Sequence, residues 1–232
     1  MTVLSALSLC TLTSCDDGRI YDSTSAGPEG KVVKLQAELS GLENWPGKYD
    51  LALAGFDDED EYAIISKVIS STEDDGSVTM VMAGIDDEVT NVKLCVLDQL
   101  RRLVVSFGEA DVTTARDTVY MNLGTVDASM FNAIQQNVFN TTCANCHGAS
   151  NTAAAGLYLT EGKSYQALVG QASAKIDGKK IVEPGDAANS VLHMALSTDS
   201  SATWRYNHQS EVTNSRTLTL IDNWINNGAK EN

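Results

Sequence analysis

The run from Cys143 to His147 places two cysteines three positions apart, with a histidine directly after the second. Two thiols at this spacing can add across the two vinyl groups of a porphyrin, while the next side chain reaches the iron. With 5 cysteines and 3 histidines in 232 residues, the pattern rarely arises by chance. The sequence therefore predicts one covalent haem c, bound by Cys143 and Cys146, with His147 as the proximal iron ligand.

Two other chemistries use cysteines at this spacing. A redox dithiol of the thioredoxin kind lies beside a strand–helix crossover pattern, which is missing here. A zinc site needs two further ligands at close spacing, whereas His193 and His208 are fifteen positions apart. The sequence therefore favours haem attachment over a redox dithiol and over half of a zinc site.

Helices are expected to position the motif. A helix capped by Asp127 carries apolar residues at helical spacing and leads to the first cysteine. Further helices are predicted near residues 164–169, after a capping Asp186, and over residues 215–227, where Gly228 ends the last one. The second half of the chain is thus predicted to be helical.

From about Asp127 to Ala229 the sequence resembles a bacterial class I-like cytochrome c domain. The resemblance depends on four motifs: Cys143-Ala144-Asn145-Cys146-His147-Gly148, Tyr165-Gln166-Ala167-Leu168-Val169, Pro184-Gly185-Asp186 followed by Ser190, and Trp224-Ile225-Asn226-Asn227-Gly228-Ala229. Members of that family are small all-α bundles around one haem and transfer single electrons. The resemblance implies an all-α, cytochrome c-like haem domain over residues 127–232.

The resemblance also raises the question of the sixth iron ligand. The family usually offers a methionine from a Met-Pro pair before the last helix, whereas residues 200–209 have neither and contain His208. His208 is therefore expected as the distal ligand. Met194 and His193 are the alternatives, against simpler roles as a core methionine and an exposed helix residue. The haem surroundings are expected to include Trp204, Arg205 and Tyr206, with Arg205 either pairing with a propionate or solvated.

Residues 31–125 are predicted to form a separate all-β domain. Short runs alternate between apolar and polar residues and are separated by turn residues. The runs lie at Val33–Leu39, Leu51–Phe56, Tyr62–Ile69, Val78–Met82, Val92–Leu97, Leu103–Phe107 and Thr118–Leu123. Seven strands in roughly a hundred residues are typical of an immunoglobulin-like sandwich.

The links after the second, fourth and sixth strands should emerge at one end of the sandwich, and they are rich in acids. Such oxygen clusters can bind Ca²⁺, although solvated carboxylates are the simpler interpretation. The candidate calcium ligands are Asp57, Asp58, Asp60, Asp86 and Asp87. The β part has no histidine and no catalytic grouping, so it is expected to act as a spacer or docking module.

The first fourteen residues carry no charge, and Leu12-Thr13-Ser14 with the following Cys15 resembles the lipobox of bacterial lipoproteins. In that family the leading segment is removed and the cysteine is acylated. The segment departs from the family in lacking a basic region, and a buried N-terminal strand is the alternative. The expected organisation is a signal with lipidated Cys15 over residues 1–15, a linker over 16–30, the β domain over 31–125 and the haem domain over 127–232. This places the protein at a bacterial cell envelope, facing the periplasm or the cell surface, with a lipid anchor as its only membrane contact.

The net charge of −15 argues against nucleic acid and anionic lipid surfaces as partners. The charge is uneven, with 22 acids and 9 bases from Asp16 to Val126 against 9 acids and 7 bases afterwards. Docking at the haem part should therefore depend weakly on salt, whereas partners of the β part should be basic or calcium-bridged.

These features predict a lipid-anchored monohaem c-type cytochrome that carries single electrons between redox protein partners, and that is an electron carrier rather than an enzyme. Six-coordinate iron leaves no vacant position for a substrate. Two alternatives stay open. One is a haem peroxidase or oxidase subunit with an open or displaceable sixth position, and the other is a surface binding or assembly protein with a structural or sensing haem.

Overall fold

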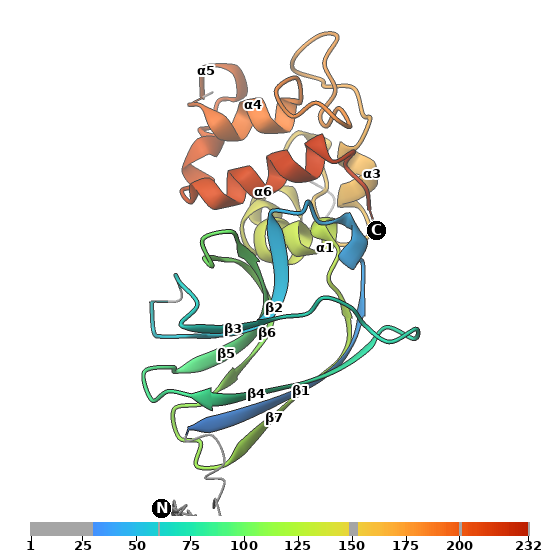
Figure 1. The fold of residues 1–232 in the computed structure, drawn as a ribbon. Helices are drawn as coiled ribbons and strands as arrows, with labels where there is room; N and C mark the ends of the chain where they lie inside the picture. The colour runs from blue at the N-terminus through green and yellow to red at the C-terminus, as the bar shows by residue number, and fades with distance from the viewer. Residues whose placement is uncertain (1–29, 60, 149–152, 200, 232) are drawn as a thin grey trace, which may run out of the picture.

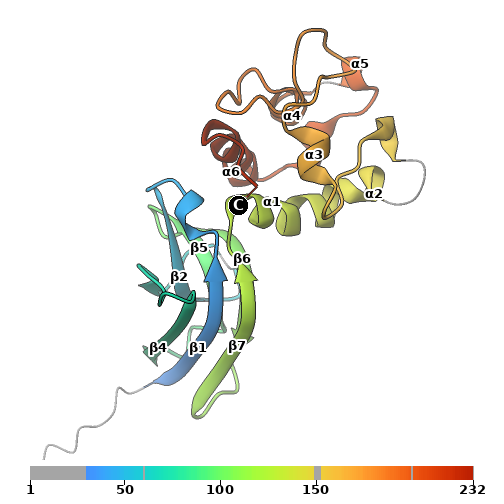
Figure 2. The ribbon, with the colours of Figure 1, turned by 90° about the vertical axis from the view of Figure 1, so that its right-hand side faces the viewer.

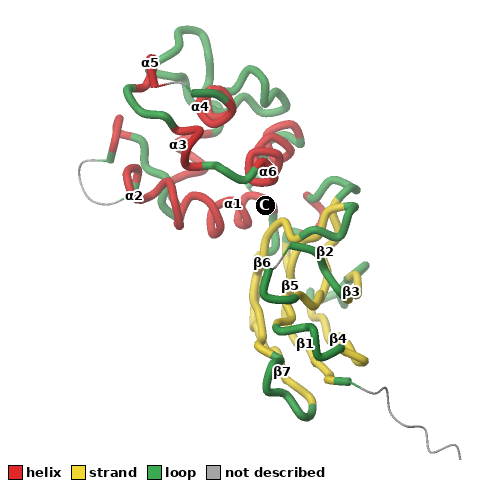
Figure 3. Tube along the Cα trace, turned by 90° about the vertical axis from the view of Figure 1, so that its left-hand side faces the viewer, coloured by secondary structure: helices red, strands yellow, loops and turns green. Residues whose placement is uncertain are grey.

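The computed structural model describes residues 30–59, 61–148, 153–199 and 201–231. Within them seven strands form two sheets, and short helices gather at one end of the sheets (Figures 1 and 3). The predicted signal with Cys15, and all but the last residue of the predicted linker, lie outside the described residues. Among the helices that the structure describes, none is long and apolar enough to cross a membrane.

The β part consists of a three-stranded and a four-stranded sheet, with strand orders β4-β1-β7 and β3-β2-β5-β6. In the first sheet β1 runs antiparallel to β4 and parallel to β7, whereas all pairs of the second are antiparallel. The strands are β1 (Lys31–Ser40), β2 (Tyr49–Phe56), β3 (Ile65–Val68), β4 (Ser77–Ile85), β5 (Asn91–Asp98), β6 (Leu103–Asp111) and β7 (Thr118–Asp127).

Alternation along the strands creates the core between the sheets. In β1 the side chains of Val33 and Leu35 are buried, while those of Gln36 and Glu38 on the opposite face are exposed. The central strands β2 and β5 are buried on both faces, since a second apolar cluster around Phe56 covers the outer face of their sheet. The four-stranded sheet therefore buries apolar side chains on both of its faces.

The helical part begins with an unbroken stretch over residues 130–147. It comprises α1 (Met130–Ile134), the π-helix η2 (Gln135–Cys143) and α2 (Ala144–His147). The remaining elements are η4 (Ala154–Gly156), α3 (Ser164–Leu168), α4 (Val191–Ser197), α5 (Ser201–Trp204), η5 (His208–Glu211) and α6 (Ser215–Asn226). Helix α6 buries Ile221, Trp224 and Ile225 on one face, and Gly228 with a φ of 94° follows its end.

The β part and the helices share one packed junction (Figure 2). Val105 of β6 belongs to the apolar core of the helices, and Tyr49 and Phe107 pack against this core and the core between the sheets. The indole of Trp45, which follows the short helix η1 (Leu42–Asn44), donates a hydrogen bond of 2.7 Å to the carbonyl of Ala128. Burial of these groups makes the two parts one continuous fold.

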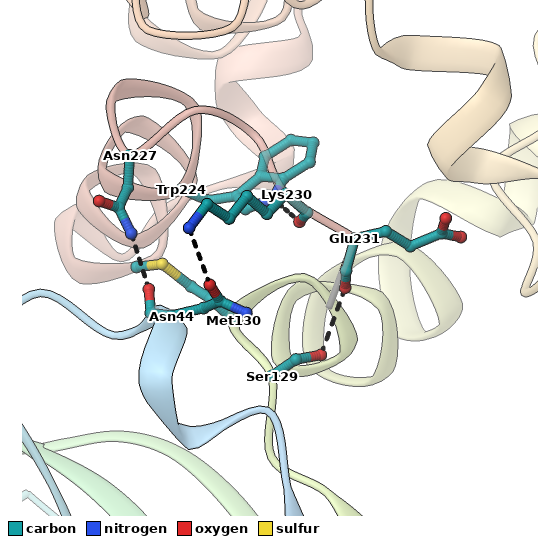
Figure 4. A pocket seen from close by; sticks show the side chains of 7 residues that line it. All are labelled: Asn44, Ser129, Met130, Trp224, Asn227, Lys230 and Glu231. Atoms are coloured by element: carbon teal, nitrogen blue, oxygen red, sulfur yellow. Dashed lines mark hydrogen bonds between the residues drawn. The ribbon is translucent and has the colours of Figure 1, made fainter.

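Polar groups close the same junction near the C-terminus (Figure 4). The backbone carbonyl of buried Asn44 accepts a 2.7 Å hydrogen bond from Asn227, and its side-chain oxygen accepts one of 3.2 Å from Lys230. The indole of Trp224 donates to the carbonyl of Lys230 at 2.8 Å. The cavity that these residues line with Met130 measures only about 10 Å³, about the size of one water molecule.

The predicted fold class is therefore wrong. The structure is mainly β, with seven strands in two sheets and short helices built onto them, and not a separate immunoglobulin-like sandwich joined to an all-α domain. Apart from α6, with 12 residues, the described helices have nine residues or fewer. The two parts are not separate domains because they share one core. The helices bury residues of β6 and of the start of β2.

The resemblance of residues 127–232 to a bacterial class I-like cytochrome c domain is contradicted as well. Isolated β-bridges join Val169 to Val182 and Ala172 to Lys180 within this region. Among the described residues, no group of three or more His, Cys, Asp or Glu side chains is placed to hold a metal ion. The domain boundaries at residues 125 and 127 stay a prediction, with β7 ending at Asp127 and α1 beginning at Met130.

Replacing Trp224 with alanine is expected to lower the free energy of unfolding by about 3–5 kcal/mol, because the indole is 2 % exposed and contacts Phe131 in the shared core. Urea denaturation followed by circular dichroism measures this loss, and the variant should unfold in one transition. Tyr120→Ala, at a side chain that is 65 % exposed, is the control and should change the free energy by about 0.5 kcal/mol or less. A loss below about 1 kcal/mol for Trp224→Ala would contradict the shared core.

Candidate functional site

Cys143, Cys146 and His147 lie at the junction of η2 and α2. At positions i, i+3 and i+4 of a continuous helical stretch, their side chains share one face. Both cysteines are free thiols, Cys143 half-buried and Cys146 exposed. The structure thus presents two thiols and an imidazole toward the same side.

The imidazole of His147 is held in one tautomer. Its Nδ1 lies 3.0 Å from the carbonyl oxygen of Ala154 in η4. A carbonyl oxygen only accepts hydrogen bonds, so Nδ1 carries the proton and the lone pair of Nε2 is free to bind a metal. A second contact, from the N–H of Leu159 to the carbonyl of His147 at 2.7 Å, fixes the backbone. This is the arrangement that a metal-binding histidine needs.

The ring of His208, in η5, faces the ring of His147. Their centroids are 6.2 Å apart and their planes differ by 28°. An imidazole binds a metal through a nitrogen lone pair that lies in the plane of its ring, so two stacked rings do not by themselves point two lone pairs at one ion between their faces. The structure therefore brings the two imidazoles together near the motif, and the binding of one iron by both stays a prediction.

His208 has an unmet hydrogen-bonding group. Its Nδ1 atom is buried and has no hydrogen-bond partner in the described part of the chain. Burial, and then the nearby His147, lower the pKa of His208, so that the ring is neutral at physiological pH. A neutral imidazole is the form that binds metals.

Aromatic and acidic side chains surround His208. The rings of Trp204 and Tyr206 stand edge-on to it, with centroids at 6.5 and 5.2 Å. The phenol of Tyr206 donates a short hydrogen bond to the carboxylate of Glu211, which raises the pKa of Tyr206. Arg205, between Trp204 and Tyr206 in the sequence, has an exposed side chain and a φ of 60°.

The alternative distal ligands lie differently. The Nδ1 atom of His193 is 2.8 Å from a carboxylate oxygen of Asp222 in α6, which occupies this ring nitrogen. Met194 is half-buried in α4. The structure thus brings His208 to the motif and pairs His193 with α6.

Two participants were not predicted from the sequence. The carbonyl of Ala154 orients His147, and a backbone acceptor leaves no signal in residue type. Glu211 bonds Tyr206 and contributes to the raised pKa of Cys143. Glu211 lies three residues after the predicted ligand His208, and this closeness in the sequence was the available signal.

The predicted acidic links do lie at one end of the β part, since Phe56 pairs with Asn91 and Asn91 with Asp111. Their carboxylates make local contacts. Asp57 and Asp86 accept backbone N–H bonds of 3.0 and 3.2 Å from residues two positions later, and Asp87 pairs with Lys31 at 3.4 Å. Asp58 is exposed, and Asp60 lies outside the described residues. Calcium binding by these loops stays a prediction.

The two thiols of the haem-free chain should react at different rates. Burial, and then the charge of Glu211, raise the pKa of Cys143 to about 11. At pH 8 its thiolate fraction is then about one in a thousand, and its alkylation should accelerate as the pH rises toward that value. Peptide mass spectrometry after brief iodoacetamide treatment should find exposed Cys146 modified first. Equal rates at pH 8 would contradict the burial of Cys143.

Comparison of this chain with protein-family models, with curated proteins and with solved structures finds no match. The assignment of a function therefore depends on the chemistry of the described side chains.

Proposed function

We propose that this protein binds one haem covalently through Cys143 and Cys146 and acts as a monohaem c-type cytochrome that carries single electrons. The observation that carries the proposal is the helical face shared by Cys143, Cys146 and His147, where the carbonyl of Ala154 orients the imidazole of His147. His208 lies close by, with its ring centroid 6.2 Å from that of His147. When bound, the haem supplies a one-electron iron couple. In this proposal His147 and His208 would hold the iron of that haem.

The surrounding residues support this role. The carbonyl of Ala154 keeps the proton of His147 on Nδ1 and so leaves Nε2 as the ligand atom. Trp204 and Tyr206 pack edge-on against His208 and restrict its rotation. If His147 and His208 both hold the iron, no position would be left for a substrate, and this favours a relay of electrons.

We also propose that the protein works at the bacterial cell envelope, held by a lipid on Cys15, and exchanges electrons with redox proteins. Covalent haem attachment at such a motif takes place outside the cytoplasm, which agrees with the exported leader predicted from the sequence. The β part serves in this proposal as a spacer or docking module. Its acids favour basic partners there.

Spectra and mass of the purified chain test this function. Denatured protein should retain the mass of one haem, and the ferric form should be low-spin without the near-infrared sulfur-to-iron charge-transfer band, since both axial ligands are nitrogens. A redox titration should show reversible reduction by one electron per chain. A chain without haem would contradict the proposal, and rapid cyanide or peroxide binding to the resting form would favour a peroxidase or oxidase subunit instead.

A further inference from the structure

A cleft of about 320 Å³ lies at the junction of the β part and α6, away from the residues proposed to hold the haem. Its lining comes from the start of β2, the β5–β6 turn and the first turns of α6, which lies over these strand ends (Figure 1). The volume is within the range of small-molecule sites, about 300–1,000 Å³. Neither the haem proposal nor the packing of the fold assigns it a role.

The lining is cationic in an otherwise acidic chain. Lys48, Arg102 and Arg216 carry positive charge there, and Asp98 is the one carboxylate among the lining residues that the structure describes. The whole chain has a net charge of −15. Arg102 pairs with Asp98 and Arg216 with Glu61, so the positive charge of Lys48 is the part of this lining that favours an anion.

The single carboxylate is already fully used. One oxygen of Asp98 accepts the backbone N–H groups of Leu100 and Arg102, both at 2.9 Å. The other accepts the guanidinium of Arg102 at 2.8 and 2.7 Å. Burial alone would raise the pKa of Asp98, but these bonds from Arg102 outweigh it and lower the pKa. Asp98 is therefore ionised, and its charge compensates that of Arg102 and of no other cation in the lining.

Several donors in the cleft remain without acceptors. The Nε atom of Arg216 is buried and lacks a partner among the described residues, while its Nη1 is 3.3 Å from Glu61. Lys48 donates to the side-chain oxygen of Asn223 at 2.8 Å, so the amide nitrogen of Asn223 must face Tyr49 and donates to its hydroxyl at 2.6 Å. The hydroxyl proton of Tyr49 is thus free to be donated.

We propose that this cleft binds a small organic anion through its carboxylate or phosphate group. The remaining donors of Lys48 and the hydroxyl of Tyr49 supply charge-assisted hydrogen bonds to the oxyanion, and the guanidinium of Arg216, which also pairs with Glu61, adds positive charge. The side chain of Leu100, which is 63 % exposed, and that of Val104 offer apolar contact to the carbon part of the ligand. The proposal concerns a second site and does not depend on the haem.

Calorimetric titration of the purified full chain with succinate, and separately with inorganic phosphate, tests this proposal at constant ionic strength. Saturable binding of either probe is expected, with changes in the amide resonances of Leu100 and Ser215. A stronger response to succinate identifies a carboxylate ligand and a stronger response to phosphate a phosphate ligand.

Arg216→Gln and Lys48→Gln should each weaken the binding at least about tenfold. Lys67→Gln removes the same charge at a lysine that donates to the carbonyl of Val81 outside the cleft, and it should bind as the parent does. Equal affinity in Arg216→Gln and the parent, or a response that sodium chloride reproduces at the same ionic strength, would overturn the proposal. The haem spectrum recorded on the same samples tests the proposed function separately.

Discussion

Replacing both Cys143 and Cys146 with serine is expected to abolish covalent haem attachment. Serine keeps the size and polarity of the side chain but provides no sulfur to form a thioether with a porphyrin vinyl group. Because both residues lie on one helical face beside His147, each should supply one of the two links. The mass of the denatured variant should equal that of the polypeptide alone.

The single substitutions and a third cysteine provide the controls. Cys143→Ser and Cys146→Ser should each retain at most one thioether and give a lower yield of haem-containing protein. Cys95→Ala changes a fully buried cysteine of β5 in the core of the β part and should leave haem attachment intact. If the double variant still carries covalent haem, the attachment site lies elsewhere and the proposed function is wrong.

Replacing His208 with alanine is expected to convert low-spin ferric iron to high-spin iron and to open the sixth position. In the proposed site His208 is the distal ligand, so its removal would take away the distal nitrogen while His147 stays. Cyanide should then bind rapidly, whereas the parent protein should resist it. Optical and electron paramagnetic resonance spectra measure the change of spin state.

His193→Ala is the matched control, since it removes an imidazole from the same part of the chain. His193 contacts Asp222 of α6, whereas the ring that lies beside His147 is that of His208, so loss of His193 should leave the low-spin spectrum unchanged. His208→Met should restore low-spin iron and raise the reduction potential by about 100 mV or more, because a thioether favours the ferrous state. A low-spin spectrum in His208→Ala, or a spin change in His193→Ala, would show that the distal ligand is another residue.

Local structure followed closely from the sequence. The alternation from Val33 to Leu39 corresponds to β1, and the apolar stripe of the last predicted helix corresponds to α6, which begins at Ser215 as expected. Such patterns depend on the period of a strand or helix and on which face is buried, and both are encoded by neighbouring residues. These elements were therefore predictable.

One helix start illustrates where local patterns stop being sufficient. Asp127 was expected to cap the helix before the motif, but the side chain of Ser129 accepts the N–H of Asn132, and Asp127 accepts the N–H of Ser129. Both residue types are good caps. The pairing of Ser40 with Asp127 keeps the latter in β7 and moves the helix start to Met130.

The fold class was missed because an alternating strand shows which face is buried but not what covers it. Trp45, Tyr49 and Phe107 pack against helices as well as strands, and Val105 lies in the helical core. The same apolar residues are compatible with a closed sandwich or with an end that helices complete. Contacts between segments far apart in the chain decided between these two arrangements.

The spacing of Cys143, Cys146 and His147 was enough to predict two thiols and one imidazole on a single helical face, because residues three and four positions apart lie on the same face of an α-helix. Which of the other histidines opposes His147 depended on the path of the chain after α4. The folded chain turns His208 toward the motif and His193 toward Asp222. Long-range packing decides which histidine lies beside His147, and the spacing of residues along the chain gives no information about it.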